Sequence, residues 1–144
     1  MNPLRTNIVD EARTWLGTPY HHQAAVKQQG VDCAQILVEV YHAVGLAERP
    51  DIGYYPSDWM LHRSEERYLG WLDQYCRRIE LAEVGPGDIV MFKFGRCFAH
   101  SGIVVHYPLI IHAQRQDNCC YANCDQGNLA DKDKLYFSFF GADK

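Results

Sequence analysis

The chain has 144 residues, of which 47% are hydrophobic, so we predict one globular domain over residues 1–144 with a core of its own. Its 14 basic and 18 acidic residues give a formal net charge of −4, which argues against a nucleic-acid-binding protein. No apolar run approaches the roughly 20 residues of a membrane span, and the N-terminus lacks the pattern of a signal peptide. We therefore expect synthesis in the cytoplasm, and free thiols for the six cysteines.

Helical spacing of apolar residues dominates the first half of the chain. It predicts three helices, over residues 8–16, 33–44 and 57–75. A loop over 17–30 separates the first helix from the second. Thr6 or Asn7 is the expected N-cap of the first helix, and Gly17 its end. The second helix places Cys33 in its first turn and stops at Gly45.

The period of the apolar residues changes in the second half of the chain. Five short apolar or alternating runs, separated by turn residues, are predicted strands: 88–94, 99–105, 109–114, 118–122 and 135–140. Helices followed by strands predict an α+β domain, in which N-terminal helices pack on a C-terminal antiparallel β-sheet.

Cys33 stands directly after Asp32, at the expected start of the second helix. A helix N-terminus favours negative charge and can lower the pKa of a cysteine, which makes the thiolate a better nucleophile. A cysteine on a helix can equally be a small buried hydrophobic residue. Its position alone leaves both interpretations open.

Two histidines offer a base for such a nucleophile. His100 and His112 lie in neighbouring predicted strands, and a hairpin centred near residue 106 would set them nearly opposite each other on one face. If that face meets Cys33, the arrangement is nucleophile, base and base-orienting residue, as in a cysteine hydrolase. His21, His42, His62 and His106 are expected to be ordinary core or surface residues.

Several stretches then resemble, in order, the NlpC-type cysteine peptidases of the bacterial cell wall, a papain-like family. They are the LGTPY of 16–20, the VDC of 31–33, the GPGDIVMF of 85–92, the AHSGI of 99–103 and the IIHA of 110–113. One departure stands beside them: Ala34 and Gln35 follow the cysteine where the family usually has Ser-Gly.

The resemblance implies a papain-like α+β fold and roles for individual residues. Cys33 would be the nucleophile, His100 the general base and His112 the residue that orients it. The implied substrates are peptidoglycan stem peptides, commonly cleaved between D-glutamate and the diamino acid. Four residues are expected to bind substrate: Tyr20, Asp32, Gln35 and Ser101.

Two further stretches, 22–23 and 55–59, look most like a phage- and prophage-encoded subgroup of the family, which would make phage tail proteins possible partners. Two alternatives to the peptidase stay open. One is a tail-assembly or docking module that keeps the fold with little activity. The other is an amidase or acyltransferase, because a thioester can pass its acyl group to water or to another nucleophile.

A zinc site is the remaining alternative. Cys119, Cys120 and Cys124 with His112 could be read as metal ligands, but adjacent cysteines without C-x-x-C pairs fit a tetrahedral zinc site poorly. We therefore expect no metal and no cofactor.

Overall fold

The computed structural model describes residues 2–48, 67–95, 97–115 and 117–141. Its α-helices are α1 (Pro3–Arg13), α2 (Cys33–Ala43) and α3 (Arg67–Tyr75). Its main sheet comprises β3 (Arg77–Ile79), β4 (Ile89–Phe94), β5 (Cys97–His106), β6 (Leu109–Ala113), β7 (Cys119–Asn123) and β8 (Lys134–Ser138). A small hairpin, β1 (Ala25–Val26) and β2 (Gly30–Val31), and two 3₁₀ helices, η2 (Leu81–Glu83) and η3 (Gly127–Leu129), complete the described elements.

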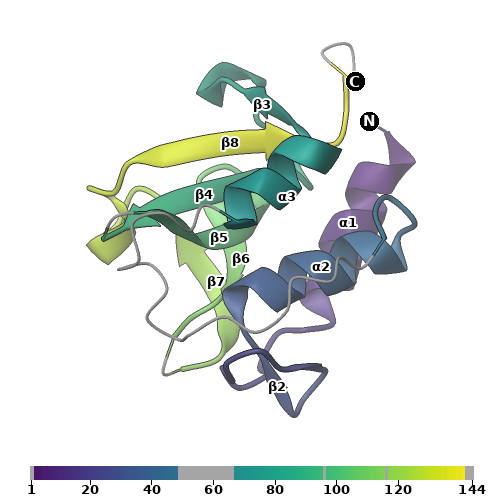
Figure 1. The fold of residues 1–144 in the computed structure, drawn as a ribbon, viewed down its shortest axis with the longest axis vertical. Coiled ribbons are helices and arrows are strands. Elements are labelled where there is room, and N and C mark those ends of the chain that lie inside the picture. Colours follow the sequence, from purple (N-terminus) through teal and green to yellow (C-terminus); the bar gives the residue numbers. More distant parts are fainter. Residues whose placement is uncertain (1, 49–66, 96, 116, 142–144) are drawn as a thin grey trace.

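The main sheet is antiparallel throughout, with the strand order β3-β8-β4-β5-β6-β7. Figure 1 shows α1 and α2 side by side against this sheet, and both helices contact β5. The main core lies between these two layers. The predicted α+β architecture, with N-terminal helices packed on a C-terminal antiparallel sheet, is therefore confirmed.

The start of α1 differs from the prediction. The helix begins at Pro3, and the side chain of Asn2 accepts the backbone N–H of Leu4 at 2.9 Å. Proline is favoured at the first helical position, where its missing N–H costs no hydrogen bond. Periodicity alone pointed to Thr6 or Asn7, because the first turn of α1 adds little to the apolar pattern.

The predicted strands are all present, with ends that differ by one or two residues. The sequence did not indicate β3 or the small hairpin of β1 and β2, which are only two or three residues long. Of the helix predicted over 57–75, the part at 67–75 is seen as α3, and the rest lies outside the described residues.

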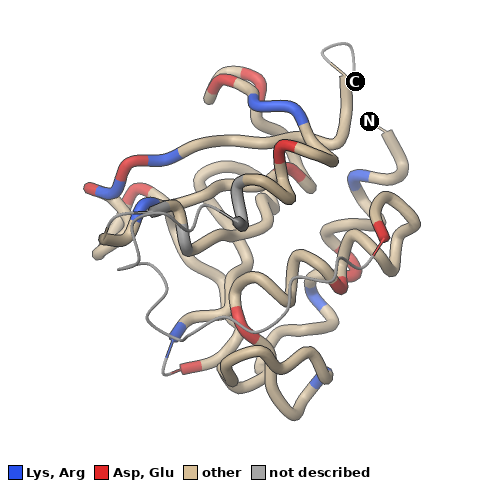
Figure 2. Tube along the Cα trace, viewed as in Figure 1, with Lys and Arg blue, Asp and Glu red and all other residues tan. Residues whose placement is uncertain are grey.

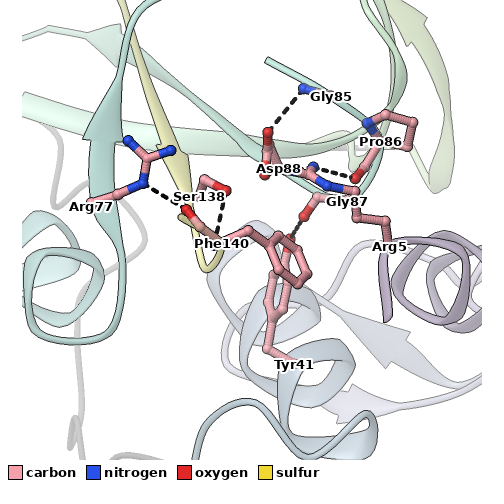
Figure 3. A network of polar contacts seen from close by, with 9 residues as sticks. All are labelled: Arg5, Tyr41, Arg77, Gly85, Pro86, Gly87, Asp88, Ser138 and Phe140. Carbon is pink, nitrogen blue, oxygen red and sulfur yellow. Dashed lines mark hydrogen bonds and ion pairs between the residues drawn. The ribbon is translucent and has the colours of Figure 1, made fainter. Parts of the chain in front are cut away.

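A buried polar network ties the helices to the start of β4 (Figure 3). The guanidinium of Arg5 in α1 lies 3.0 Å from the carboxylate of Asp88 and donates to the carbonyl oxygen of Pro86 at 2.8 Å. From α2, the hydroxyl of Tyr41 donates to the carbonyl oxygen of Gly87 at 2.6 Å. Both helices of the layer are thus bonded to one turn of the sheet.

Charged residues of both signs are interspersed along the described chain (Figure 2), as the near-balanced composition suggests. Within the described residues, none of the helices has the length and apolar character needed to cross a membrane.

Candidate active site

Cys33 occupies the first position of α2, and Asp32 caps that helix. The Asp32 side chain is buried and accepts the backbone N–H groups of Ala34 at 3.1 Å and Gln35 at 2.8 Å. Its other oxygen accepts the N–H of Gln23 at 2.7 Å. Three backbone donors therefore hold the residue next to the thiol, and they fix both the helix start and the loop that precedes it.

His100 and His112 meet across β5 and β6. His100 Nε2 and His112 Nδ1 are 2.8 Å apart, and the two rings are nearly perpendicular, with centroids 5.0 Å apart. The pairing differs from the expected hairpin, because Ile103 pairs with Ile111. Continued by one residue, this register puts residue 102 across from His112, so that His100 is a diagonal neighbour. Diagonal pairs remain within reach of ring side chains.

Cys33, His100 and His112 line one cavity of about 430 Å³. Tyr20, His22, Asp32 and Ala34 lie along it on the helical side. On the sheet side it is lined by Phe94, Gln114, Arg115, Ala122 and Asn123, with Gln126, Gly127, Asn128 and Leu129 from the connection that leads to β8. Of the expected substrate-binding residues, Tyr20 and Asp32 are therefore at the cavity, whereas Gln35 and Ser101 are not among its lining residues.

The ionisation of Cys33 differs from the expectation drawn from its helix position. Burial raises the pKa of the Cys33 thiol, and the Asp32 carboxylate raises it further. The backbone N–H groups of Cys33, Ser101 and Ala34 act in the opposite direction, but they do not outweigh these two effects. Cys33 is therefore a thiol at neutral pH, and it would need a base to act as a nucleophile.

The two histidines are neutral at neutral pH. Burial lowers the pKa of His100, and the neighbouring His112 lowers it further. Burial also lowers the pKa of His112, while Asp117 acts against that shift. A neutral imidazole can accept a proton, so His100 has the protonation state that a general base requires.

A family model, the NlpC/P60 family, matches residues 17–134. The chain belongs to the NlpC/P60 family. The matched segment contains Cys33, His100 and His112, and it confirms the resemblance seen in the sequence at the level of the family. The phage-associated subgroup stays a prediction.

Solved structures share the NlpC/P60 fold. The NlpC/P60 domain of the peptidoglycan hydrolase SagA is 20% identical, with a TM-score of 0.63, over 91% of this chain and 96% of that domain. A lipoprotein-like NLP/P60 protein from Staphylococcus aureus is 18% identical, with a TM-score of 0.71, over 98% of this chain and 43% of that one. The peptidoglycan hydrolase RipB from Mycobacterium tuberculosis is 12% identical, with a TM-score of 0.64, over 96% and 66%.

The chain thus spans nearly all of the SagA domain but less than half of the Staphylococcus aureus protein. No curated protein sequence matches the chain.

The segment around Tyr20 forms one wall of the cavity, and backbone hydrogen bonds attach this segment to the sheet. The N–H of Tyr20 donates to the carbonyl oxygen of Asp117 at 2.9 Å, and the N–H of Gly17 donates to that of Cys119 at 2.8 Å. Burial raises the pKa of Tyr20, the Cys33 thiol and Asp32 raise it further, and Arg115 lowers it. The phenol therefore stays protonated and can donate a hydrogen bond into the cavity.

Sequence reasoning missed several lining residues of this NlpC/P60 site. Arg115 lies two residues beyond the end of β6, and closeness in sequence to His112 is the one signal that could have pointed to it. The 126–129 segment carries no motif, because it reaches the cavity only through the path of the chain between β7 and β8.

The zinc site considered as an alternative has no ligand cluster in the described chain. Among residues 2–48, 67–95, 97–115 and 117–141, no group of three or more His, Cys, Asp or Glu side chains is arranged to hold a metal ion. The described cysteines carry free thiols: Cys33, Cys76, Cys119, Cys120 and Cys124.

Proposed function

We propose that this chain is a cysteine peptidase that hydrolyses peptide bonds in peptidoglycan stem peptides, with Cys33, His100 and His112 as its catalytic residues. The observation that carries the proposal is one cavity lined by a helix-terminal cysteine and by a histidine pair joined at 2.8 Å. Membership of the NlpC/P60 family supports the peptidase class. The names of two structural neighbours, SagA and RipB, describe peptidoglycan hydrolases and support the substrate.

The first half of the reaction forms a thioester. His100 takes the proton of the Cys33 thiol at Nδ1, the ring nitrogen that does not bond His112, and the sulfur attacks the amide carbon. The backbone N–H of Cys33, at the N-terminus of α2, stabilises the negative oxygen of the tetrahedral intermediate. The imidazolium then gives its proton to the leaving amine, and the C–N bond breaks.

The second half releases the acyl group to water. His100 takes a proton from the water as its oxygen attacks the thioester carbon, the C–S bond breaks, and the imidazolium returns the proton to sulfur. In both halves, His112 Nδ1 accepts the N–H at His100 Nε2. This bond keeps Nδ1 of His100 directed toward the Cys33 thiol or the attacking water.

The scissile bond in this proposal is the one between D-glutamate and the diamino acid. It is supported by the family resemblance of the motifs around Cys33, His100 and His112. A phage or prophage association has narrower support, from the stretches 22–23 and 55–59, of which the second lies outside the described residues.

The cavity favours the peptidase over the docking module. In a module, we expect the groove above Cys33 to be filled by Gln35 or by the C-terminal segment. Among the described residues, neither Gln35 nor the segment 135–141 lines the cavity, whereas Cys33 does.

The decisive experiment is digestion of defined muropeptides with mass analysis of the products. We expect the wild-type chain to cut the stem peptide after D-glutamate, and Cys33→Ala, which loses the nucleophile, to lose at least about 10³-fold in kcat. Thermal melts of both proteins control for folding. If both proteins are folded and equally inert on every stem peptide, the docking module becomes the better interpretation. A product in which the acyl group is attached to an amine or alcohol instead of water would indicate an acyltransferase.

A second test needs no substrate. Among the described thiols, Cys33 is the one that lines the cavity together with a base, so we expect iodoacetamide at about pH 6 to label it before the others. Peptide mapping identifies the labelled residue, and His100→Ala, which removes the base, serves as the control and is expected to label more slowly. Preferential labelling of Cys120 would contradict the assignment.

A further inference from the structure

Ser101 combines full burial with two contacts to the proposed nucleophile. It lies on β5 directly after His100, pairs with Met91 of β4, and is 0% exposed. Because side chains alternate along a strand, Ser101 points from β5 into the main core, whereas the neighbouring His100 leaves the strand in the other direction and lines the cavity with Cys33. The neighbours of Ser101 on its face of the sheet include Met91 and Ile103 of the main core. A hydroxyl in such apolar surroundings lowers stability unless it is hydrogen-bonded.

The hydroxyl finds its partner in α2. Ser101 Oγ donates to the carbonyl oxygen of Cys33 at 3.1 Å. The backbone N–H of Ser101 also favours the thiolate form of Cys33, together with the N–H groups of Cys33 and Ala34. One strand residue therefore reaches the nucleophile through its side chain and through its main chain.

We propose that Ser101 is a positioning residue for the Cys33–His100 pair, holding the first turn of α2 against β5 through its hydrogen bond to the Cys33 carbonyl oxygen. The inference rests on the proposed function. Because Ser101 and His100 are consecutive, a bond that fixes Cys33 relative to Ser101 also fixes the separation between the thiol and the imidazole. Without the hydroxyl, the helix start can shift away from the strand, and proton transfer at this pair slows steeply with such displacement.

The expected substrate-binding role of Ser101 is replaced in this proposal. A fully buried side chain that donates to a helix carbonyl and does not line the cavity has no surface to offer a peptide.

The test compares Ser101→Ala with a matched loss of a buried serine hydroxyl elsewhere. Ser138 on β8 is 1% exposed, and its hydroxyl oxygen accepts the N–H of Phe140 at 3.0 Å (Figure 3). It is not among the lining residues of the cavity. Both alanine variants lose one buried hydrogen bond, so both are expected to melt at a lower temperature. Only Ser101→Ala is expected to lower kcat for muropeptides, by roughly 10- to 100-fold with KM within about twofold.

Alkylation of Cys33 supplies a readout that does not depend on the substrate. In Ser101→Ala we expect the pH midpoint of iodoacetamide labelling to rise by about half a unit or more, because the Ser101 N–H no longer holds its place beside the sulfur. Ser138→Ala is expected to keep the wild-type midpoint. If the wild-type chain hydrolysed no muropeptide, the peptidase proposal would fail, while the labelling profiles would still decide the role of Ser101.

Ser101→Thr and Ser101→Val complete the design, since the two side chains have nearly the same shape and only threonine keeps the hydroxyl. We expect the threonine variant to recover most of the labelling rate, and the valine variant to stay at least about fivefold slower than the threonine variant. This pair also decides the matter if Ser101→Ala does not fold. Equal rates in the threonine and valine variants, or equal losses in Ser101→Ala and Ser138→Ala, would overturn the proposal.

Discussion

The hydrogen bond between His100 and His112 constrains where each ring carries its proton. For His100 to accept the thiol proton at Nδ1, its Nε2 must carry a hydrogen and donate to Nδ1 of His112. His112 must then carry its own hydrogen at Nε2, a buried atom that has no hydrogen-bond partner among the described residues. This arrangement leaves one buried N–H donor of His112 without a partner, and it leaves Nδ1 of His100 free to accept a proton. A neutral histidine also stabilises the imidazolium less than a carboxylate would.

Replacement of His112 separates orientation from charge. We expect His112→Asn to keep at least about a tenth of kcat, because an amide oxygen can accept the same N–H of His100. His112→Asp should also remain active and shift the acidic limb of its pH profile to higher pH, since a nearby negative charge raises the pKa of His100. His112→Ala should lose roughly 10²- to 10⁴-fold in kcat.

Muropeptide hydrolysis across a range of pH measures all three variants, with thermal melts to show that each is folded. Equal activity of the alanine and asparagine variants would show that His112 does not orient the base.

At the scale of elements, the register between β5 and β6 decides whether the histidines meet. Gly102 stands between His100 and the paired residue Ile103, and a Cβ at this position would lie 2.5 Å from Cδ1 of Ile110. Such a contact cannot exist without movement of the isoleucine, which is itself fully buried. The absent side chain therefore allows Ile110 to pack across the hairpin beside the His100–His112 pair.

Gly102→Ala is expected to lower the free energy of unfolding by about 1–3 kcal/mol through overpacking, and to reduce kcat by displacing β6 and with it His112. Gly70→Ala is the matched control, because Gly70 lies in α3 with open space at its Cβ position. There the substitution should raise stability by about 0.5–1 kcal/mol through helix propensity, and leave kcat unchanged. Urea unfolding and muropeptide hydrolysis of both variants provide the measurement, and a Gly102→Ala protein as stable as the wild type would refute the packing argument.

The sequence predicted the helices and the longer strands, and it located the Asp32–Cys33 helix start, because caps and apolar periods are local. It placed His100 and His112 on neighbouring strands but missed their register. The pairing shifts between Val104 and His106, and no periodicity in the sequence marks such a shift. The cavity wall at 126–129 was beyond sequence reasoning for a similar reason, since tertiary path alone brings it there.

For the whole molecule, the proposed catalysis depends on the contact between the helical layer and the sheet. The helical layer supplies Cys33 and the sheet supplies the histidines, so the relative placement of the layers sets the geometry of the site. The buried Arg5–Asp88 pair and the Tyr41 hydroxyl bond both helices to the turn that begins β4 (Figure 3). Stability and activity are therefore coupled in this fold, and conditions that loosen the layers should affect both.

Acid is such a condition, because the unfolded chain takes up protons at His100 and His112 more readily than the folded chain does. The pKa values of His100 and His112 are lowered in the folded chain from the ordinary value of 6.5. Below about pH 6.5 the unfolded chain therefore binds more protons than the folded chain, and the free energy of unfolding falls as the pH drops. Between pH 7.5 and 5.5 the two histidines together should account for a loss of about 2–3 kcal/mol.

Urea unfolding at these two pH values isolates this contribution when the wild type is compared with a double variant, His100→Gln/His112→Gln. The double variant should lose less stability on acidification, since glutamine does not titrate, whereas His106→Gln, a change at an exposed histidine on the same strand, should behave as the wild type does. The carboxylates shared by all three proteins cancel in the comparison. If the double variant and the wild type lost the same free energy between the two pH values, His100 and His112 would not be held neutral by the fold, and the base would have to act from a different protonation state.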